Sequence, residues 1–419
     1  MQCYKKLKVL HVALTDSGGA GRGMLNLHRA LLDIGIDSKV LVAIKQSKAD
    51  FVYSVKPNRN IWHHSPCICF LERVFRKCGI CFNPYDRIIR RIYKKAATHP
   101  AVFSSPITQY DIANHPLVLQ ADIINLHFIS GFVDIGSFFR SVNKPIVWTI
   151  RDENPGLGGF HYRVTRDRLY SYYSDIEDTF LKIKRQAIGE YKNLHLVSLS
   201  KLMASFCQSV DFLAIHPNRI IYNPLDARSY SLTDKAKAKE QLGFHVDDIL
   251  ISFVACNLDE KRKGLKQVVD ALKLLEDKRI KLLCIGHSTT RMDVPNVFLG
   301  GTITDTQKMS LVYAASNVFV APSSQESFGK TIVEALYCGT PVVCTPVGIA
   351  PEIINRSNGL LCKTGGAVDV ADAIREVLRR KYDGEKIRKE ALGRFSSGLI
   401  AKQYFDLYSN ILKKCTTYL

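Results

Sequence analysis

The chain has 419 residues, of which 46% are hydrophobic, and this is enough apolar material for two packed domains. Its formal net charge of +19 favours anionic partners, such as phosphorylated substrates or an anionic membrane surface. There is neither zinc-finger spacing nor an aromatic-rich RNA-binding motif, so we expect no nucleic-acid partner. No run is as long and apolar as a membrane helix, and the basic start leads into a short apolar run typical of a first strand. We therefore expect a cytoplasmic protein.

The 12 cysteines are mostly scattered through apolar segments, which is typical of reduced, buried thiols and not of a disulfide framework. Four cysteines are clustered near two histidines: Cys67, Cys69, Cys78 and Cys81, with His63 and His64. Their spacing is tight for a closed tetrahedral site, so zinc is the less favoured alternative there. We expect the chain to need no metal.

The N-terminal segment has the pattern of a Rossmann-like opening. Residues 8–14 are predicted to form a strand, residues 16–23 a glycine-rich turn, residues 24–34 a helix and residues 38–44 a second strand. The turn is not a dinucleotide fingerprint, because Met24 stands where the third glycine would be and no acid closes the second strand. We therefore do not expect NAD binding.

Residues 86–96 predict a basic amphipathic helix. One face carries Ile88, Ile89, Ile92 and Tyr93, and the other carries Arg87, Arg90, Arg91, Lys94 and Lys95. Such a helix can lie on an anionic membrane, or it can pack its apolar face on the protein core. We favour the second alternative.

Further apolar runs predict the remaining elements. In the first domain we expect strands at 121–127, 144–150 and 194–198, the last being its final strand, and helices at 137–142 and 200–207. In the second domain we expect strands at 249–255, 280–286, 297–301 and 359–361, and helices at 235–242, 266–275, 368–380 and 399–412.

The most informative stretch is a strand, loop, helix and strand between residues 317 and 344. Residues 317–320 form the first predicted strand, residues 330–337 the helix and residues 341–344 the second strand, which is a βαβ crossover in a parallel sheet. Ligands bind at the carboxyl ends of such strands, where helix N-termini attract anions. Glu326 lies in the loop and Glu334 lies one turn into the helix.

These residue types suit a sugar nucleotide. A loop carboxylate such as Glu326 can accept hydrogen bonds from sugar hydroxyls, and Glu334 can hold a ribose diol. The N–H groups at the helix start, around Gly329, Lys330 and Thr331, can bind a diphosphate. An isolated pair of glutamates is more often a loop acid and a solvated helix residue. The surrounding residues decide between these interpretations.

The strings E-S-F-G, E-A, G-T-P-V-V and P-V-G follow one another between residues 326 and 348. Together they resemble the nucleotide-binding signature of family 4 retaining glycosyltransferases. The resemblance implies the α/β GT-B fold, in which two Rossmann-like, doubly wound parallel-sheet domains face each other across a cleft. It implies an acceptor-side domain at 1–222, joined by a closing helix at 399–419 that crosses back, and a nucleotide-sugar-binding domain at 223–398.

The resemblance also implies a set of donor-binding residues. They are Gly19, Asn257, Lys263, Glu326, Phe328, Gly329, Lys330, Thr331 and Glu334. Gly19 would approach the diphosphate from the first domain. Asn257 stands where the family has an arginine, and Lys261 or Arg262 could replace the missing charge. A solvated basic loop remains the alternative for Lys263.

Two strings in the first domain, A-D-I-I-N-L-H and K-P-I-V-W-T-I-R-D-E-N-P, are similar to enzymes of bacterial surface-polysaccharide assembly. Arg151 stands where many of these relatives carry histidine, next to a retained Asp152. We take both as catalytic candidates together with Glu326 and Lys263. His127 and His161 are candidates for the acceptor cleft, with core histidines as the alternative.

The resemblance implies transfer of a sugar, with retention, from a UDP- or GDP-linked donor to a glycan or lipid-linked acceptor. The expected process is the biosynthesis of lipopolysaccharide, capsule or exopolysaccharide. No metal and no further cofactor are expected, and the enzyme could lie on the inner face of the membrane. Two alternatives remain: another GT-B enzyme, such as a phosphorylase or a nucleotide-sugar epimerase, and a degenerate protein that binds a nucleotide sugar. Transfer to an acceptor separates the first from a transferase, and donor binding without turnover reveals the second.

Overall fold

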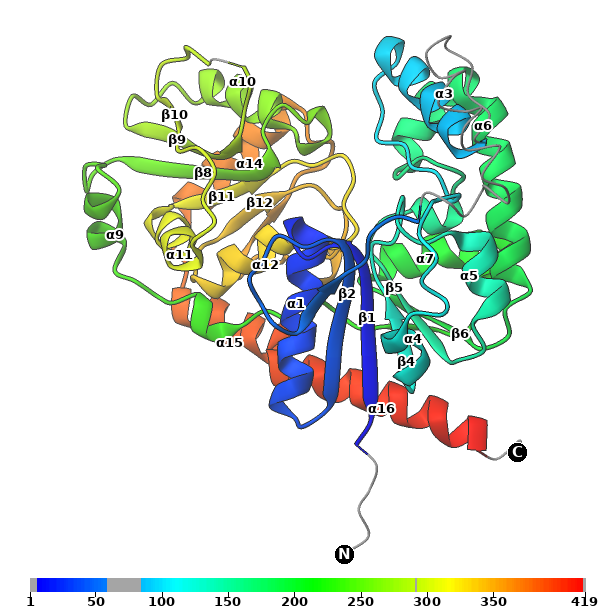
Figure 1. The fold of residues 1–419 in the computed structure, drawn as a ribbon. Coiled ribbons are helices and arrows are strands. Elements are labelled where there is room, and N and C mark those ends of the chain that lie inside the picture. The colour runs from blue at the N-terminus through cyan, green and yellow to red at the C-terminus, as the bar shows by residue number, and fades with distance from the viewer. Residues whose placement is uncertain (1–5, 59–83, 291, 417–419) are drawn as a thin grey trace, which may run out of the picture. The chain divides into compact units, whose positions relative to one another are not determined.

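The computed structural model of the protein describes residues 6–58, 84–290 and 292–416 (Figure 1). The chain divides into two compact units. The first comprises Met1–Ser198, Met203–Ile220 and Tyr404–Leu419, and the second comprises Leu199–Leu202 and Ile221–Gln403. The cysteine and histidine cluster between residues 63 and 81 lies outside the described residues.

The first unit is built on a parallel sheet of seven strands in the order β3-β2-β1-β4-β5-β6-β7. The strands are β1 Lys8–Thr15, β2 Asp37–Ile44, β3 Val52–Ser54, β4 Ile123–Leu126, β5 Ile146–Ile150, β6 Leu194–Ser198 and β7 Asn218–Ile220. The helices are α1 Gly18–Asp33, α3 Pro84–Thr98, α4 Pro116–Gln120, α5 Ile135–Ser141, α6 Arg163–Gly189, α7 Lys201–Ser209 and α8 Asp211–Ala214. The strands β4 and β5 are buried along their whole length, as apolar runs in a parallel sheet covered on both faces should be.

The glycine-rich segment after β1 is part of a helix, so the predicted turn at residues 16–23 is wrong. Helix α1 begins at Gly18, six residues before the predicted start. A Cβ atom on Gly21 would come within 2.5 Å of the backbone carbon of Asp16. Glycine is therefore needed for the first turn of α1 to pack directly on the end of β1. Gly19 lies in this first turn, with nothing within 4 Å of its Cβ position.

The basic helix α3 packs on the core of the first unit. Ile92 is buried in that core, and Ile88 and Ile89 pack against it. Tyr93, expected on the same face, is 71% exposed and does not pack into that core. On the polar face, Arg91 and Lys95 form ion pairs with Asp175 of α6, a helix that the sequence analysis did not anticipate.

The second unit is built on a parallel sheet of six strands in the order β10-β9-β8-β11-β12-β13. The strands are β8 Ile249–Asn257, β9 Ile280–His287, β10 Val297–Leu299, β11 Val318–Ala321, β12 Val342–Cys344 and β13 Gly359–Leu361. The helices are α9 Lys235–Gln241, α10 Leu265–Leu275, α11 Thr306–Ala315, α12 Lys330–Tyr337, α13 Ala350–Ile353, α14 Ala367–Arg379 and α15 Gly384–Phe395. The last helix, α16 Ser397–Thr416, starts in this unit, and its residues from Tyr404 onward belong to the first unit. The pair α10 and α14 covers one face, and α11, α12 and α15 cover the other (Figure 1).

The predicted fold class of two Rossmann-like parallel-sheet domains is therefore confirmed. The expected return of the last helix to the first unit is confirmed as well. In α16 the Tyr404 hydroxyl lies 3.0 Å from Thr149 Oγ1, and the Tyr408 hydroxyl accepts a hydrogen bond of 2.6 Å from Asn125 Nδ2. One strand assignment is wrong, because β7 follows β6 at the sheet edge, so residues 194–198 are not the final strand of this domain.

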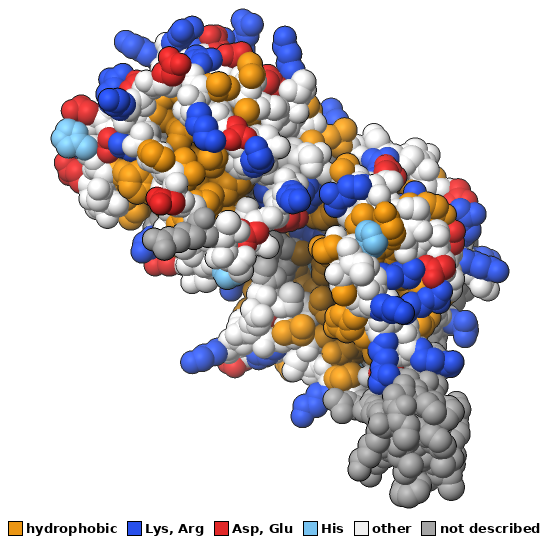
Figure 2. Space-filling view, turned by 90° about the horizontal axis from the view of Figure 1, so that it is seen from above, with side chains coloured by type: hydrophobic (Ala, Val, Ile, Leu, Met, Phe, Trp, Pro, Cys, Tyr) orange, Lys and Arg blue, Asp and Glu red, His pale blue; other side chains and the backbone are white. Residues whose placement is uncertain are grey.

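Within the described residues, no helix is long and apolar enough to cross a membrane. Lysine and arginine side chains are spread over the face drawn in Figure 2 and do not gather in one patch there. The expected cytoplasmic location and the contact with an anionic membrane both stay predictions.

Candidate functional site

The candidate site of the second unit is formed where three loops meet at the carboxyl edge of its sheet. A Cβ atom on Gly264, which has φ +83°, would lie 2.5 Å from the carbonyl oxygen of Pro322. Ser324 N–H donates a hydrogen bond of 2.8 Å to the carbonyl of Arg262. The loop after β8 is thereby fastened to the loop after β11. The loop after β12 joins them, because Ile349 N–H donates a hydrogen bond of 2.8 Å to the carbonyl of Phe328.

This fastening brings together two residues that are 63 positions apart in the chain. Lys263 Nζ lies 2.5 Å from Glu326 Oε1, and Arg262 Nη1 lies 3.6 Å from the same oxygen. Burial works to raise the pKa of Glu326, but the charges of Lys263 and Arg262 outweigh it and the pKa is lowered. Glu326 is therefore an ionised carboxylate between two cations. Lys263 and Glu326 were both predicted to belong to the site, and the structure places them in contact.

A second ion pair lies at the start of α12. Lys330 Nζ is 2.9 Å from Glu334 Oε1, and the buried Tyr313 hydroxyl donates a hydrogen bond of 2.8 Å to Glu334 Oε2. Burial works to raise the pKa of Glu334, but Lys330, Tyr230 and Tyr313 together lower it. Glu334 is 6% exposed, so it is not a solvated helix residue.

The N-terminus of α12 lies between these two ion pairs in the sequence. Gly329 has φ +90°, a left-handed conformation that favours glycine, and it caps the helix. The N–H groups of Lys330 and Thr331 belong to the first helical turn, which has no intrahelical acceptors, whereas Ile332 N–H donates to the Gly329 carbonyl. These N–H groups can receive an anion. The Phe328 ring is buried against Phe395, so only its backbone is available for the predicted donor contact.

Asn257, which stands where the family has an arginine, serves a local turn. The side-chain oxygen of Asn257 accepts a hydrogen bond of 2.9 Å from Asp259 N–H, which closes a local turn. Of the two cations suggested as substitutes, Lys261 is exposed, whereas Arg262 is half-buried and lies beside Glu326. Arg262 is thus the second cation of this loop.

In the first unit, Asp152 and His161 are in contact. His161 Nδ1 lies 2.6 Å from Asp152 Oδ2, and His161 Nε2 lies 2.8 Å from Ser104 Oγ. Asp152 Oδ1 accepts a hydrogen bond of 3.0 Å from Asn154 N–H. The imidazole thus stands between a carboxylate and the half-buried hydroxyl of Ser104, which the sequence analysis did not single out.

Two buried charges of α6 hold the loop between Asp152 and His161. Glu177 accepts hydrogen bonds from the N–H groups of Gly158 at 2.9 Å and Gly159 at 2.6 Å. Lys184 Nζ donates to the carbonyls of Asn154 at 2.6 Å and Leu157 at 2.9 Å. Burial lowers the pKa of Lys184 to about 7. Sequence reasoning missed both charges, and the only available signal was an acid and a lysine seven positions apart on one helix face.

The other predicted acceptor-side residue, His127, lies in the core. Arg151 Nη2 donates a hydrogen bond of 3.0 Å to His127 Nδ1, and His127 Nε2 lies 2.9 Å from His11 Nδ1. Because a guanidinium only donates, His127 Nδ1 must accept, and its Nε2–H then donates to His11. Burial lowers the pKa of His127 well below its ordinary value and lowers that of Arg151 to about 10. His127 is therefore a neutral core histidine that supports Arg151.

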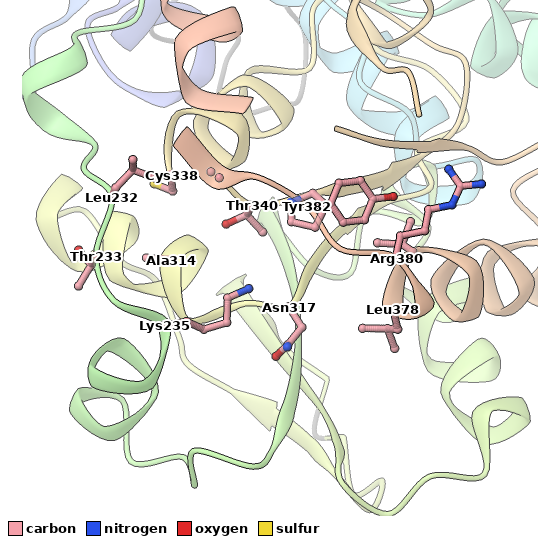
Figure 3. A pocket seen from close by; sticks show the side chains of 14 residues that line it. Leu232, Thr233, Lys235, Ala314, Asn317, Cys338, Thr340, Leu378, Arg380 and Tyr382 are labelled. Atoms are coloured by element: carbon pink, nitrogen blue, oxygen red, sulfur yellow. The ribbon is translucent and has the colours of Figure 1, made fainter. Parts of the chain in front are cut away.

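A cavity of about 270 Å³ lies at the opposite, amino edge of the second sheet (Figure 3). Asn317 and Pro341, which precede β11 and β12, line it together with Lys235 and Thr340. It therefore does not include the loops of the candidate site. In the part of the chain that the structure describes, no three His, Cys, Asp or Glu side chains are grouped as metal ligands. Independence from metal stays a prediction.

Comparison with known proteins finds glycosyltransferases. Residues 249–380 match the family described as "Glycosyl transferases group 1". The N-acetyl-alpha-D-glucosaminyl L-malate synthase of Bacillus anthracis is 29% identical over 215 residues, which are 48% of this chain and 56% of that protein. The capsular polysaccharide biosynthesis glycosyltransferase CapM of Staphylococcus aureus is 27% identical over 40% of this chain and 48% of CapM. These matches thus span about half the length of the curated relatives.

Solved structures share the fold over the whole chain. Sucrose-phosphate synthase from Thermosynechococcus elongatus superposes with a TM-score of 0.68 at 18% identity, covering 98% of this chain and all of that one. Anabaena Alr3699/HepE in complex with UDP-glucose gives 0.64 at 17% identity, covering 96% and 100%. The fold is GT-B, and the resemblance to glycosyltransferases inferred from the motifs is confirmed.

Proposed function

We propose, from the premise that residues 249–380 are a Glycosyl transferases group 1 region, that the protein transfers a sugar from a nucleotide-diphosphate sugar to a hydroxyl acceptor. One observation carries this proposal. Two lysines, two glutamates and a helix N-terminus, all from that region, meet at the carboxyl edge of one parallel sheet. This arrangement suits a ligand that combines an anionic diphosphate with hydroxyl-bearing sugars on either side.

The electrostatics suit a reaction in which negative charge develops on a leaving diphosphate. Lys263, Lys330 and the N–H groups at the start of α12 would stabilise that charge from fixed positions. Glu334 would hold the ribose hydroxyls and Glu326 the hydroxyls of the transferred sugar. Gly19 of the first unit stays a candidate for a further diphosphate contact.

The proposed transfer retains the configuration of the sugar. The bond from the anomeric carbon to the diphosphate oxygen breaks, and the bond to the acceptor oxygen forms on the same face. The acceptor proton passes to the leaving diphosphate. Asp152 and Arg151 stand at the carboxyl end of β5 and are the proposed contacts to the reacting sugar. No metal is required by this scheme, because the cations that stabilise the diphosphate come from the chain itself.

The acceptor is proposed to be a glycan or lipid-linked sugar of a bacterial surface polysaccharide. CapM, whose name assigns it to capsular polysaccharide biosynthesis, supports this proposal, as does the net charge of +19. In the first unit, His161 is 2% exposed and both of its ring nitrogens have partners, so it supports Asp152 from the core just as His127 supports Arg151.

A binding screen by thermal unfolding tests the donor site. UDP, GDP, ADP and their common sugars are compared on the wild type and on Glu334→Ala. A ligand present at one hundred times its Kd should add about 2.7 kcal/mol of stability. We expect one nucleotide to stabilise the wild type and to leave Glu334→Ala unchanged.

Glu376→Ala is the matched control. Glu376 also pairs with a basic residue four positions away, Arg380, but it lies on α14 outside the site. This variant should respond to the nucleotide as the wild type does. A folded wild type that no nucleotide stabilises would contradict the proposal.

A further inference from the structure

The two ion pairs at the candidate site have the same composition. Each joins a lysine that would bind the diphosphate to a glutamate that would bind sugar or ribose hydroxyls: Lys263 with Glu326, and Lys330 with Glu334. The four side chains are 22%, 17%, 19% and 9% exposed, so each pair is largely removed from water but open on one side. Without a ligand, the site therefore supplies its own counter-ions.

A ligand that takes the two lysines leaves Glu334 with the Tyr313 hydroxyl but no cation, and leaves Glu326 with Arg262 at 3.6 Å as its remaining cation. A half-buried carboxylate that loses its counter-ion carries the full cost of its desolvation. Burial by itself raises the pKa of both glutamates. Their surroundings therefore disfavour the ionised carboxylate when no partner is present. A free diphosphate would thus gain two lysines, while each of the two carboxylates would lose its lysine and gain no new partner.

A complete nucleotide sugar avoids this cost. Its diphosphate takes the lysines, while hydroxyls of the ribose and of the transferred sugar donate hydrogen bonds to the carboxylates that the lysines leave. Hydrogen bonds from hydroxyls to ionised carboxylates are stronger than those between neutral groups. Each glutamate thereby exchanges one partner for another.

We propose that the pairs Lys263–Glu326 and Lys330–Glu334 act as a counter-ion exchange that selects ligands carrying a diphosphate and flanking hydroxyls together. This inference rests on the proposed function and adds a mechanism of selectivity. Inorganic pyrophosphate, which has no sugar hydroxyls, competes with both glutamates for the lysines and binds weakly. A nucleoside diphosphate offers ribose hydroxyls to Glu334 but has no transferred sugar whose hydroxyls could bind Glu326. After transfer, Glu326 recovers Lys263 and favours release of the nucleoside diphosphate product.

Pyrophosphate is a suitable probe because its binding does not depend on which base or sugar the protein uses. Its Kd is measured by calorimetry on the wild type, Glu326→Gln, Glu334→Gln and the double variant. Glutamine has the shape of glutamate without its charge, so the lysines stay in place and lose their internal competitor. We expect each single variant to bind pyrophosphate about tenfold more tightly, and each to bind the nucleotide sugar from the screen more weakly than the wild type.

Asp270→Asn is the control for net charge. Asp270 pairs with Lys266 and Lys273 on the exposed surface of α10, close in sequence to Lys263. Removing this carboxylate changes the total charge by the same amount and should leave the pyrophosphate Kd within twofold. The inference is overturned if Glu326→Gln binds pyrophosphate no more tightly than the wild type, or if Asp270→Asn gains as much. Failure of the proposed function would give a different result, because no nucleotide would then bind the wild type.

Discussion

The charged groups of the two units are held in opposite ways. In the second unit, Lys263 and Lys330 each contact one glutamate side chain at the rim of the sheet and keep about a fifth of their surface exposed. In the first unit, Lys184 and Glu177 are buried and bind backbone groups of one loop through several hydrogen bonds each. The first arrangement can exchange its partner for a ligand. The second cannot do so without opening the loop that it holds.

A buried charge is therefore not by itself evidence of a ligand site. Lys184 has its pKa lowered to about 7, yet its three bonds go to carbonyl oxygens of the chain. The lysines of the second unit contact glutamate carboxylates instead. The phosphates of a sugar nucleotide can take the place of these carboxylates. The following variants test this contrast.

The largest effect is expected for Lys184→Met. The variant removes the donor from three buried oxygens of Asn154 and Leu157, whereas Glu177 keeps its ion pair with Arg166. Each buried acceptor left without a donor costs about 1–3 kcal/mol. Urea unfolding should report this loss, while Lys182→Met, at an exposed position of the same helix, should stay within about 0.5 kcal/mol of the wild type. Similar costs for the two variants would contradict the contrast.

A pH effect is expected from His28 in the first unit. Burial lowers the pKa of His28 to about 4, below the value of about 6.5 of an unfolded histidine. As the pH falls from about 6.5 to about 4, the unfolded state takes up the proton first, so stability is lost across that window and is present above it. The full loss for this one group is roughly 3 kcal/mol.

His28→Gln removes this proton uptake and should flatten the pH dependence of the unfolding free energy between pH 6.5 and 4. The comparison is between slopes, because the variant also changes the contact between His28 Nδ1 and Ser38 Oγ at 2.7 Å. Equal slopes for the variant and the wild type would show that His28 does not titrate in this range.

Gly264→Ala should weaken nucleotide binding by moving the Lys263 loop. The added Cβ meets the Pro322 carbonyl at 2.5 Å and also requires a left-handed conformation, which together should cost about 2–3 kcal/mol. Gly243 has φ +80° but nothing within 4 Å of its Cβ position. Gly243→Ala should therefore cost only about 1 kcal/mol and leave the nucleotide Kd unchanged. Thermal unfolding with and without nucleotide checks both variants.

The smallest effect is expected for Asp270→Asn. The pairs that Asp270 forms with Lys266 and Lys273 lie on the surface of α10, where such contacts are worth about 0.3–0.5 kcal/mol. If the variant lost more than about 1 kcal/mol of unfolding free energy in urea, the surface ion pairs of this unit would be stronger than expected.

How far the sequence predicted the structure depended on whether the signal was local. Helix α12 and strands β6 and β13 have the predicted bounds, because their apolar periodicity ends at glycine or at polar residues. The start of α1 was missed because its glycines serve a packing contact with the backbone of Asp16, which no local pattern reveals. The motif between residues 326 and 348 identified the two glutamates as site residues and predicted the fold.

The same motif did not reveal how the site residues are paired. Glu326 meets Lys263 where Gly264 lets two distant loops touch, and Phe328 turns into the core. The roles of the Ser104 hydroxyl and the Glu177 carboxylate were missed for the same reason, because their hydrogen-bond partners lie in other elements. Contacts of this kind follow from tertiary packing.

The contrast between the two kinds of buried lysine can be tested in one measurement. The side-chain nitrogen resonances of Lys263, Lys330 and Lys184 are recorded by NMR on ¹⁵N-lysine-labelled protein, with and without the nucleotide sugar that the binding screen selects. Lysine-to-arginine variants assign the signals. We predict that the resonances of Lys263 and Lys330 move as phosphate oxygens replace the glutamates, whereas that of Lys184 stays in place. Unchanged signals from Lys263 and Lys330 in the bound state, or an equal shift of Lys184, would contradict the account.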